Sequence, residues 1–480
     1  MLFLPLLAGL VGCPSGPAAV IPTTPAHADT KLVAACPDRK IAELLDNYSK
    51  NWANRQRSEV RTVIFDPSAG NAPDADLWVI PAVQLPRLAK EDRLRTLPEE
   101  YMGDRNANWT DLLPLYREQL LAWNHKRFAF PLLGEAPVCG YRDDLFQNPG
   151  HQAAFEQQYK RKLAPPQTWE QFADIAEYFH KHGPAGQPGP SLPPLPSDDE
   201  ELARQFYTIA ACYAKRAALE GTGIEGGKAE DTYSFEYDIN TGRPRIDGPG
   251  FVDALKLMRD RLQPCRPPGT SEDPNGAFAA GKAVLCLAEA AQLVAFQDKR
   301  KSAVRDKVGI CRIPGAEVQG EPNRVPYLGA HAYLTVVPKS TQQPAAAFAL
   351  AAEMCSRSTS RLIVMEPGRW NTGPIRLSQL DEPKVWETFD VDATRTAALG
   401  EAVRQTILHP HLRNPALRLR MPTQDAHQKI LVEALREVLA GKSDAAAGLK
   451  SVALEWSALD AKNPAHLADY RMSLGLLPNE

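Results

Sequence analysis

The sequence lacks a strong charge of either sign. Its 480 residues include 55 lysines and arginines and 58 aspartates and glutamates, which leaves a formal net charge of -3 at pH 7. Basic residues are interspersed with acidic ones, and the densest basic run is Lys299-Arg300-Lys301. A nucleic-acid-binding domain usually carries a basic patch or stripe. The composition therefore predicts no nucleic-acid partner.

The sequence also lacks the common metal and nucleotide motifs. Its 8 cysteines are dispersed without a Cys-x-x-Cys pair, and no Asp, Glu or Cys cluster accompanies His180-Lys181-His182 or His409-Pro410-His411. The segment 221–226 spells G-x-G-x-x-G, but a helix-like stretch precedes it where a dinucleotide site needs a strand. We interpret 221–226 as a turn, and we predict no metal and no cofactor.

Motifs of nucleophilic catalysis are missing as well. There is no G-x-S-x-G nucleophile elbow and no Walker lysine motif. Carboxylates are plentiful, but nothing in their spacing selects a catalytic pair. The pattern favours a binding protein over an enzyme.

Long apolar runs are scarce, and the one that matters is at the start. Residues 1–11 carry no charged side chain and are too few to cross a bilayer. They lead into Leu10-Val11-Gly12-Cys13, which resembles a bacterial lipoprotein signal that is cut before Cys13 and lipidated on it. The first basic residue is Lys31, so the basic segment of such signals is missing, and a start codon further upstream would account for this.

The alternative is an ordinary secretory signal that is cut elsewhere, for instance near Ala26-His27-Ala28. Both interpretations predict export to the periplasm or cell envelope. In the first, residues 1–12 are a signal peptide and residues 13–29, rich in Pro, Ala and Thr, are a flexible tether. We then expect a membrane attachment through the lipid of Cys13 only.

The remaining chain alternates between strand-like and helix-like segments. The first is strand 32–36, followed by a helix with apolar residues at helical spacing from Ile41 to Trp52. Strands 60–65 and 76–80 come next, a rhythm typical of a parallel α/β layer. Further helices are expected at 165–179, where Thr168 is placed to cap, and at 202–219, 251–262 and 427–439. Further strands are expected at 283–287, 308–313 and 332–337.

Cysteine pairing stays open at this point. Lipidation of Cys13 would leave seven cysteines, several of them inside apolar runs, where a cysteine usually behaves as a small core residue. An oxidising envelope permits a bridge. Cys212–Cys265 and Cys286–Cys311 are candidates, and the sequence does not choose between them.

Several segments, in order, resemble the solute-binding proteins of bacterial ABC importers that include the maltose-binding and glycerol-phosphate-binding proteins. The segment 165–172 (PPQTWEQF) is similar to that family's "P-P-x-T-W-d-e-f" helix start, and 278–285 (FAAGKAVL) resembles "F-x-x-G-K-a-A-m". Weaker matches are at 75–79, 126–131 with 138–146, 308–315, 327–341, 439–442 and Trp456.

This resemblance implies an α/β, two-lobed, periplasmic-binding-protein-like fold of type II. Crossover strands, expected near 136–141, 325–329 and 365–376, would join the lobes, with a ligand cleft between them. Residues 30–138 plus 328–368 would form lobe 1, and residues 139–327 plus 369–480 would form lobe 2. The implied function is a lipid-anchored, monomeric, non-enzymatic solute-binding protein. It would close on a small polar solute, such as a carbohydrate or its derivative, and deliver it to importer permease subunits.

The resemblance also implies which residues line the cleft, with Trp370 as the aromatic platform for a sugar ring or, equally, a core tryptophan that fills the hinge. The other candidates follow strands or sit at crossovers. They are Pro37, Asp38, Ser68, Glu135, Glu289, Gln292, Tyr327, Gly329, His331, Arg369 and Asn371.

Two departures from the family pattern bear on the ligand. Residues 288–291 read Ala-Glu-Ala-Ala where the family often has Gly-x-Trp, and residues 329–331 read Gly-Ala-His where it has Gly-Gly. We therefore expect a cleft with few aromatic platforms and many ionisable groups, suited to amine, phosphate or carboxylate groups on the solute. Two alternatives remain: an envelope carbohydrate hydrolase or lyase using two facing carboxylates, and a ligand-sensing module with the same fold.

Overall fold

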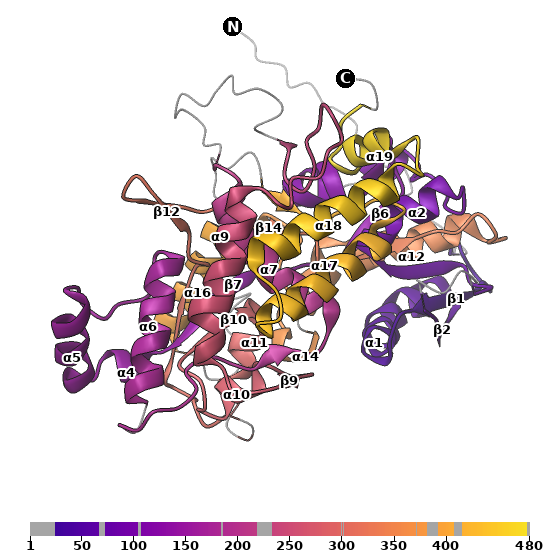
Figure 1. The fold of residues 1–480 in the computed structure, drawn as a ribbon. Helices are drawn as coiled ribbons and strands as arrows, with labels where there is room; N and C mark the ends of the chain where they lie inside the picture. Colours follow the sequence, from indigo (N-terminus) through magenta and orange to yellow (C-terminus); the bar gives the residue numbers. More distant parts are fainter. Residues whose placement is uncertain are drawn as a thin grey trace, which may run out of the picture.

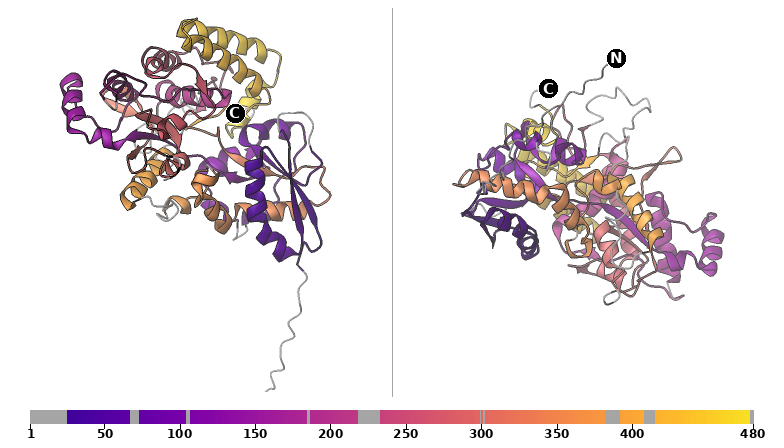
Figure 2. Two further views of the ribbon diagram at one scale, coloured as in Figure 1. Left: turned by 90° about the horizontal axis from the view of Figure 1, so that it is seen from below. Right: turned by 180° about the vertical axis from the view of Figure 1, so that it is seen from behind.

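Two β-sheets organise the chain, each covered by helices (Figure 1). The computed structural model describes residues 25–66, 73–103, 107–183, 186–217, 233–298, 300, 302–370, 372–381, 392–407 and 415–477. We call the five-stranded sheet and the helices packed on it the first lobe, and the three-stranded sheet with its helices the second lobe. In the left-hand view of Figure 2 the indigo N-terminal strands lie on one side of the molecule, with orange segments among them, and the magenta-to-rose part of the chain lies on the other side.

The first lobe is built on a mixed sheet with strand order β2-β1-β3-β15-β6. β1 pairs in parallel with β2 and β3, so the parallel arrangement expected for the first three strands is confirmed. β15 returns from far along the chain and runs antiparallel to both β3 and β6. The strands are β1 (Lys31–Cys36), β2 (Glu59–Ile64), β3 (Leu77–Pro81), β6 (Ala129–Leu133) and β15 (Tyr333–Val336).

Helix α1 (Arg39–Gln56) connects β1 to β2 and shows why this segment folds locally. The Asp38 side chain accepts a hydrogen bond from the backbone N–H of Ile41 at 2.8 Å and so caps the first turn. Apolar residues at helical spacing, from Ile41 through Leu45 to Trp52, are buried against the lobe. The predicted amphipathic helix is confirmed, and its N-terminus is fixed at the end of β1.

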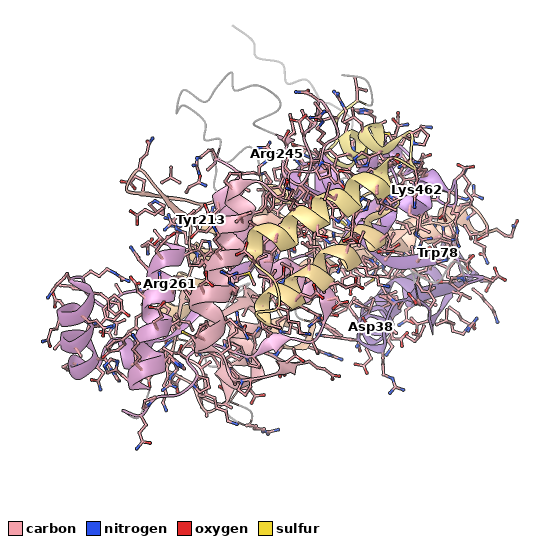
Figure 3. The ribbon with its side chains drawn as sticks, in the orientation of Figure 1. Asp38, Trp78, Tyr213, Arg245, Arg261 and Lys462 are labelled. Carbon is pink, nitrogen blue, oxygen red and sulfur yellow. The ribbon has the colours of Figure 1, made fainter. Side chains whose placement is uncertain are left out.

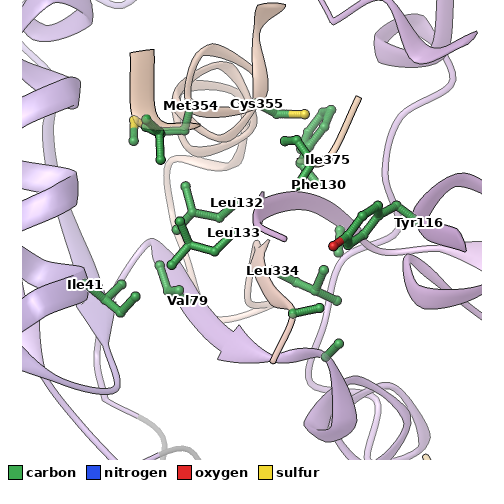
Figure 4. Packing of buried hydrophobic residues seen from close by; sticks show 14 of the residues in the cluster. Ile41, Val79, Tyr116, Phe130, Leu132, Leu133, Leu334, Met354, Cys355 and Ile375 are labelled. Atoms are coloured by element: carbon green, nitrogen blue, oxygen red, sulfur yellow. The ribbon is translucent and has the colours of Figure 1, made fainter. Parts of the chain in front are cut away.

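The core of the first lobe lies between this sheet and α12 (Pro344–Cys355) and α13 (Arg357–Val364). Figure 4 shows Leu132, Leu133 and Val79 of the sheet beneath Met354 of α12. Side chains in this cluster are almost fully buried. Packing of this density makes the sheet a rigid support for the loops at its edge.

The second lobe is built on an antiparallel sheet with order β10-β7-β11. One face packs on α16 (Ala393–Ile407), and the other packs on the core around α6 (Trp169–His182). α6 begins as predicted, because the Thr168 hydroxyl accepts a hydrogen bond from the backbone N–H of Gln171 at 3.2 Å. The strands are β7 (Pro137–Arg142), β10 (Leu285–Glu289) and β11 (Val308–Cys311).

The C-terminal helices extend the second lobe and then return to the first. α17 (Gln424–Leu439) and α18 (Ala445–Asp460), yellow in Figure 1, pack against α7 (Asp199–Ala214) and α9 (Pro249–Leu257). α19 (His466–Ser473) carries Asp469, whose carboxylate lies 2.6 Å from the Lys90 ammonium of the first lobe. The C-terminal segment therefore contacts both lobes.

The remaining elements are short and lie at the edges of the two lobes. The other helices are α2 (Leu85–Lys90), α3 (Glu100–Gly103), α4 (Asp143–Phe146), α5 (Pro149–Tyr159), α10 (Gly276–Ala279), α11 (Ala290–Ala295), α14 (Pro367–Trp370) and α15 (Ser378–Asp381). Single turns are η1 (Ala82–Gln84), η2 (Trp109–Asp111), η3 (Leu115–Leu120), η4 (Met258–Leu262) and η5 (Gln263–Cys265). Two-stranded pairs are β4 (Ala122–Trp123) with β5 (Lys126–Arg127), β8 (Leu195–Pro196) with β9 (Thr270–Ser271), β12 (Ala316–Val318) with β13 (Glu321–Asn323), and β14 (Tyr327–Leu328) with β16 (Ala416–Leu417).

The chain passes between the sheets at three neighbouring places. Residues 134–136 lead from β6 to β7, and residues 329–332 lead from β14 to β15. A third segment beyond α14 joins them through an antiparallel bridge between Gly134 and Gly373. Gly329 has a φ of 93°, which favours glycine. These crossings together form the hinge region.

The seven cysteines in the described residues are free thiols, so neither candidate bridge is formed. Cys286–Cys311 is a wrong pairing, because Cys286 lies opposite Gly140 on β7 and Cys311 lies opposite Cys139. Neighbouring residues of a strand point to opposite faces, so the two thiols are on different sides of the sheet. Cys212 instead contacts the carbonyl oxygens of Pro314 and Val325, 3.6 Å from each.

Candidate functional site

A cavity of about 710 Å³ lies between the two lobes, in the place where a two-lobed fold holds its ligand. Its floor is the hinge region, at Ala330 and His331. Helix starts and strand ends form its walls, so side chains there are positioned by rigid elements. The lining residues come from the edge of the first-lobe sheet, from the hinge and from the starts of α7 and α17, and they include far more polar than aromatic side chains.

The first-lobe wall is built at the ends of β1, β3 and β15. Asp38, labelled in Figure 3, follows β1, and Lys40 lies in the first turn of α1. Gln84 comes from the single turn after β3, and Tyr333 is the first residue of β15. Trp370 at the end of α14 completes this wall.

The second-lobe wall is formed by the N-terminal turns of α7 and α17. Asp198 caps α7 by accepting a hydrogen bond from the backbone N–H of Glu201 at 2.8 Å. Asp199 and Glu200 follow it on the first turn. The α17 wall consists of Gln424, Asp425, Gln428 and Lys429.

The five cleft carboxylates fall into two groups. Glu200 binds the Arg418 guanidinium with both oxygens, at 2.8 and 3.0 Å, and Asp199 lies 2.7 Å from Arg436. Asp38, Asp198 and Asp425 have no ion-pair partner within the described ranges. Each uses one oxygen for a helix cap or for the Gln424 amide. Because an ionised carboxylate only accepts hydrogen bonds, these three groups are suited to a ligand rich in donors.

At and beneath the cavity floor lies a set of ionisable residues, which we call the hinge network: Glu135, Glu201, Arg204, Glu289 and His331. Glu135, Arg204 and Glu289 are buried, and Glu201 and His331 are partly exposed. Glu135 is 3% exposed, and its carboxylate accepts hydrogen bonds from the backbone N–H groups of Gly329 and His331. It thereby ties the 134–136 crossing to the 329–332 crossing.

Glu289 completes the connection from the end of β10. Its carboxylate accepts a hydrogen bond from the backbone N–H of Ala136 at 2.6 Å, and one oxygen is 3.4 Å from the His331 ring. The Arg204 guanidinium is 3.8 Å from the same oxygen and binds Glu201 with two bonds of 2.6 and 2.7 Å. The 134–136 and 329–332 crossings are therefore held together by buried charge, whereas the third segment is joined to Gly134 through backbone and hydroxyl contacts.

Burial and mutual charge shift the protonation of this network. Burial and the neighbouring Glu289 charge raise the pKa of Glu135 to about 7. Burial works against a charged imidazole, but the contacts with Glu289 outweigh it and raise the pKa of His331. Burial likewise opposes ionisation of Glu289, yet His331 and Arg204 lower its pKa overall. Burial opposes ionisation of Glu201 as well, but the Arg204 charge lowers its pKa overall. Glu289 and Glu201 are thus the fixed anions of the network, and Glu135 and His331 are its titrating groups.

The residues expected to bind ligand divide between these two places. The structure brings Asp38, His331 and Trp370 to the cavity. Glu135, Glu289 and Gly329 lie in the hinge, and Gln292 forms a capping box with Glu289 at the start of α11. Tyr327 stacks on Tyr207 inside the second lobe at 5.0 Å. Ser68, Asn371 and Cys13 lie outside the described residues, as do 221–226 and 409–411.

Trp370 offers little free ring surface to a ligand. It is 2% exposed, and its indole N–H donates to the Tyr48 hydroxyl at 3.3 Å. The Arg369 guanidinium lies 4.3 Å from the ring centre and pairs with Glu366, and Arg369 is not among the described residues that line the cavity. This placement favours the interpretation of Trp370 as a packing residue of the hinge.

Most of the second-lobe wall was not anticipated from the sequence. Asp198, Asp199 and Asp425 each lie at a helix start, and the run Asp198–Glu201 after a proline-rich loop is a sequence pattern for such a start. That pattern locates the helix. It does not show that α7 and α17 begin beside the same cavity, which depends on how the helices pack.

A second cavity, of about 890 Å³, lies on the first lobe between α2, α12 and α19. Aromatic side chains including Tyr101, Trp123 and Phe348 line it, with Lys90 already paired to Asp469. It does not lie between the sheets. No group of three or more metal-ligating side chains occurs in the described part of the chain, and no described helix is long and apolar enough to cross a membrane.

Comparison with known proteins agrees with this architecture. Residues 60–392 match the family described as "Bacterial extracellular solute-binding protein". This chain belongs to that family. The match covers well over half of the sequence, so the solute-binding function expected from the sequence motifs is confirmed at the level of the family. A search of curated proteins gives no significant match.

Solved structures of solute-binding proteins share the fold of this family member over nearly its whole length. Maltose-bound MalE3 of T. maritima is similar with a TM-score of 0.66 at 16% identity, covering 90% of this chain and 100% of that one. A ribitol-bound solute-binding protein of Agrobacterium radiobacter K84 gives 0.63 at 19%, covering 90% and 99%. MalE of Xanthomonas citri gives 0.64 at 14%, covering 90% and 98%. The predicted two-lobed, periplasmic-binding-protein-like fold is confirmed.

Proposed function

We propose that this solute-binding protein captures a small polyhydroxylated solute, a sugar, polyol or derivative of one, and delivers it to an ABC importer. The observation that carries the proposal is the cavity between the lobes, with walls from both and a floor made of the hinge. Closure of such a cleft around a solute is the hinge motion of two-lobed binding proteins. Relatives of the same fold were solved with maltose, ribitol and D-mannitol.

The cleft walls indicate the chemistry of the solute. Three carboxylates without an ion-pair partner in the described part of the chain offer hydrogen-bond acceptors, and Lys40 and Lys429 offer donors. Hydroxyl groups can satisfy both. The side-chain oxygens of the three lining glutamines already accept hydrogen bonds from Arg87 and Arg418. Carboxylates outnumber lysines on the lining, so a solute with an amine is favoured over one with a phosphate or carboxylate. The small aromatic area argues for a short solute rather than a long oligosaccharide.

The location and attachment belong to the same proposal. The family is extracellular, which places the protein in the periplasm or cell envelope. We propose that residues 1–12 are a lipoprotein signal, that Cys13 carries lipid and that 13–29 is a tether. The protein would act as a monomer and contact permease subunits, with lobes made of 30–138 plus 328–368 and of 139–327 plus 369–480.

A ligand screen tests this proposal directly. The purified protein is heated with sugars, sugar alcohols, amino sugars, sugar phosphates and amino acids, and hits are confirmed by calorimetry. A melting temperature that rises with ligand concentration, with the ligand recovered unchanged, is the expected outcome. Recovery of a chemically altered ligand would contradict the transport proposal and favour the hydrolase or lyase alternative. No shift with any hydroxylated compound would overturn the proposed solute class.

Glucosamine and glucose form a matched pair for the charge argument, as do longer sugars with and without an amine. We expect the amine member of a pair to bind more tightly at pH 7 and to lose this advantage at high salt. Equal affinity would contradict the role given to the cleft carboxylates and leave the solute-binding function intact.

A further inference from the structure

Two cysteines of the second lobe face each other across neighbouring strands. Cys139 on β7 is the direct antiparallel partner of Cys311 on β11. Directly opposed residues of such a pair project to the same face of the sheet. The neighbouring Cys311 thiol and burial together raise the pKa of the Cys139 thiol.

The strand register brings the two residues within disulfide range. The backbone N–H of Asp143 donates to the carbonyl of Lys307 at 2.8 Å, so 143 and 307 are a hydrogen-bonded pair. Pairs alternate along an antiparallel ladder, which makes 139 and 311 a hydrogen-bonded pair too. Their Cα atoms are then about 5.5 Å apart, within the roughly 4.4–6.8 Å that disulfides span. The Cβ atoms of such a pair lie up to about 5.5 Å apart, so they must approach by about 1 Å to reach the roughly 3.5–4.5 Å of a disulfide. Cys311 ends β11, so its backbone can adjust as the sulfurs approach.

Of the two thiols, Cys311 is the one that an external oxidant can reach first. Cys139 is fully buried, whereas Cys311 is only partly buried and within reach of a small reagent. The protein belongs to an extracellular family, and the bacterial envelope is a compartment in which disulfides form and persist. Neither thiol is part of the cleft or of the hinge network.

We propose that Cys139 and Cys311 are an oxidation site and form a disulfide that fastens β11 to β7. The thiolate of Cys311 attacks an external disulfide, such as oxidised glutathione or the active-site disulfide of an oxidoreductase, and releases one thiol. The thiolate of Cys139 then attacks the Cys311 sulfur of the mixed disulfide and releases the second thiol. Two protein thiols are oxidised and one external disulfide is reduced.

The same sheet provides an internal control. Cys286 on β10 also flanks β7, but it lies opposite Gly140, and a side chain at Gly140 would meet the Cys286 sulfur at 2.9 Å. Cys286 therefore occupies the face opposite to Cys139 and Cys311. A disulfide between residues on the same face of the sheet would therefore not include Cys286.

The test measures thiols in the full-length protein after incubation with oxidised glutathione. We expect the denatured protein to lose the mass of two hydrogen atoms, to show two fewer alkylated cysteines, and to yield one cross-linked peptide joining 139 to 311. Cys311→Ser and Cys139→Ser should each abolish this mass loss, and Cys286→Ser should leave it unchanged. Oxidised wild type should unfold at a higher urea concentration than the reduced protein, and Cys311→Ser should show no such difference.

Several outcomes would overturn the site. Full alkylation of both cysteines after oxidation would show that the thiols do not react. A cross-linked peptide containing Cys286, or a mass loss that persists in Cys311→Ser, would assign the bridge to another pair. Stable glutathione adducts on Cys311 without ring closure would show that Cys139 cannot reach it. Ligand binding plays no part in these measurements, so their result is independent of the proposed function.

Discussion

The cleft walls and the hinge network lie next to each other. They differ in how their acidic side chains are solvated and paired. The cleft places Asp38, Asp198 and Asp425 at exposed helix starts without cationic partners within the described residues. The hinge encloses Glu135 and Glu289, each 3% exposed, and gives them several partners. Charge that water can solvate costs little stability and is available to a ligand, whereas buried charge must be matched inside the protein.

Resemblance to a family located acidic residues near the cleft, but it did not show which of them face the cavity and which are enclosed in the hinge. Both regions attract the same kind of prediction, since acidic residues after strands suit a binding site. Burial separates them: the exposed set faces the cavity, and the enclosed set holds the crossings together. Substitutions should therefore change stability in the hinge and ligand binding in the cleft.

The largest effect is expected for Glu289→Ala. The substitution removes the acceptor of the Ala136 N–H and leaves Glu201 as the remaining anion beside Arg204 and His331, so the free energy of unfolding should fall by about 3–5 kcal/mol. Urea denaturation followed by circular dichroism measures this. A loss below about 1 kcal/mol, the range of a surface ion pair, would remove the distinction between hinge and cleft.

Trp370 lies between the cleft and the hinge, so its substitution tests to which of the two regions it belongs. As a packing residue, Trp370→Ala should lower the free energy of unfolding by about 3–5 kcal/mol, and Trp370→Phe should recover part of it. Stability and affinity are measured on the same preparations. Loss of binding with unchanged stability would instead make Trp370 the ligand platform.

The pH dependence of stability should come from the hinge. A raised pKa means that folded Glu135 holds a proton that the unfolded chain has released, so stability decreases as pH rises from about 4.5 to about 7. His331, whose pKa is also raised, adds stability below the ordinary histidine pKa of about 6.5 and loses it as pH rises through its folded pKa. Both groups act in the same direction, with up to about 3 kcal/mol from Glu135.

Melting curves between about pH 5 and pH 8 measure this slope. The melting temperature should fall with rising pH, and Glu135→Gln should reduce the slope while also lowering stability at the acidic end, because one of two hydrogen-bond acceptors is lost. An unchanged slope in Glu135→Gln would assign the pH dependence to other groups.

The smallest effect on stability is expected in the cleft. Asp198→Asn retains a good helix cap, so the free energy of unfolding should change by less than about 0.5 kcal/mol. Affinity for the solute should fall by about tenfold or more, in line with the loss of a charged hydrogen bond. Asp253→Asn, with the same change of charge at an exposed position on α9, is the matched control and should leave affinity unchanged. A similar loss in both variants would point to long-range charge rather than contact.

Much of the fold could be predicted from the sequence because its information is local. Helix α1 follows from apolar spacing and Asp38, and α6 follows from Pro166, Thr168 and the apolar face behind them. The strands β1, β3 and β15 are short apolar runs. Cysteine pairing and the burial of the acidic residues depend on contacts between distant segments. For the cysteines the sequence left alternatives open. For Glu135, Glu289 and Gln292 the resemblance implied a place in the cleft, whereas the structure places them in or beside the hinge.

By itself the sequence determined the alternating α/β elements, the resemblance to solute-binding proteins and the expectation of a cleft poor in aromatic rings. Only the tertiary structure decided that Asp198 and Asp425 share a wall, that Glu135 and Glu289 are enclosed beneath it, and that Cys311 faces Cys139 rather than Cys286. The physical reason is the separation in sequence over which each interaction acts. Caps and periodic burial act within a few residues, whereas register, burial of charge and the meeting of two helix starts depend on contacts between segments far apart in the chain.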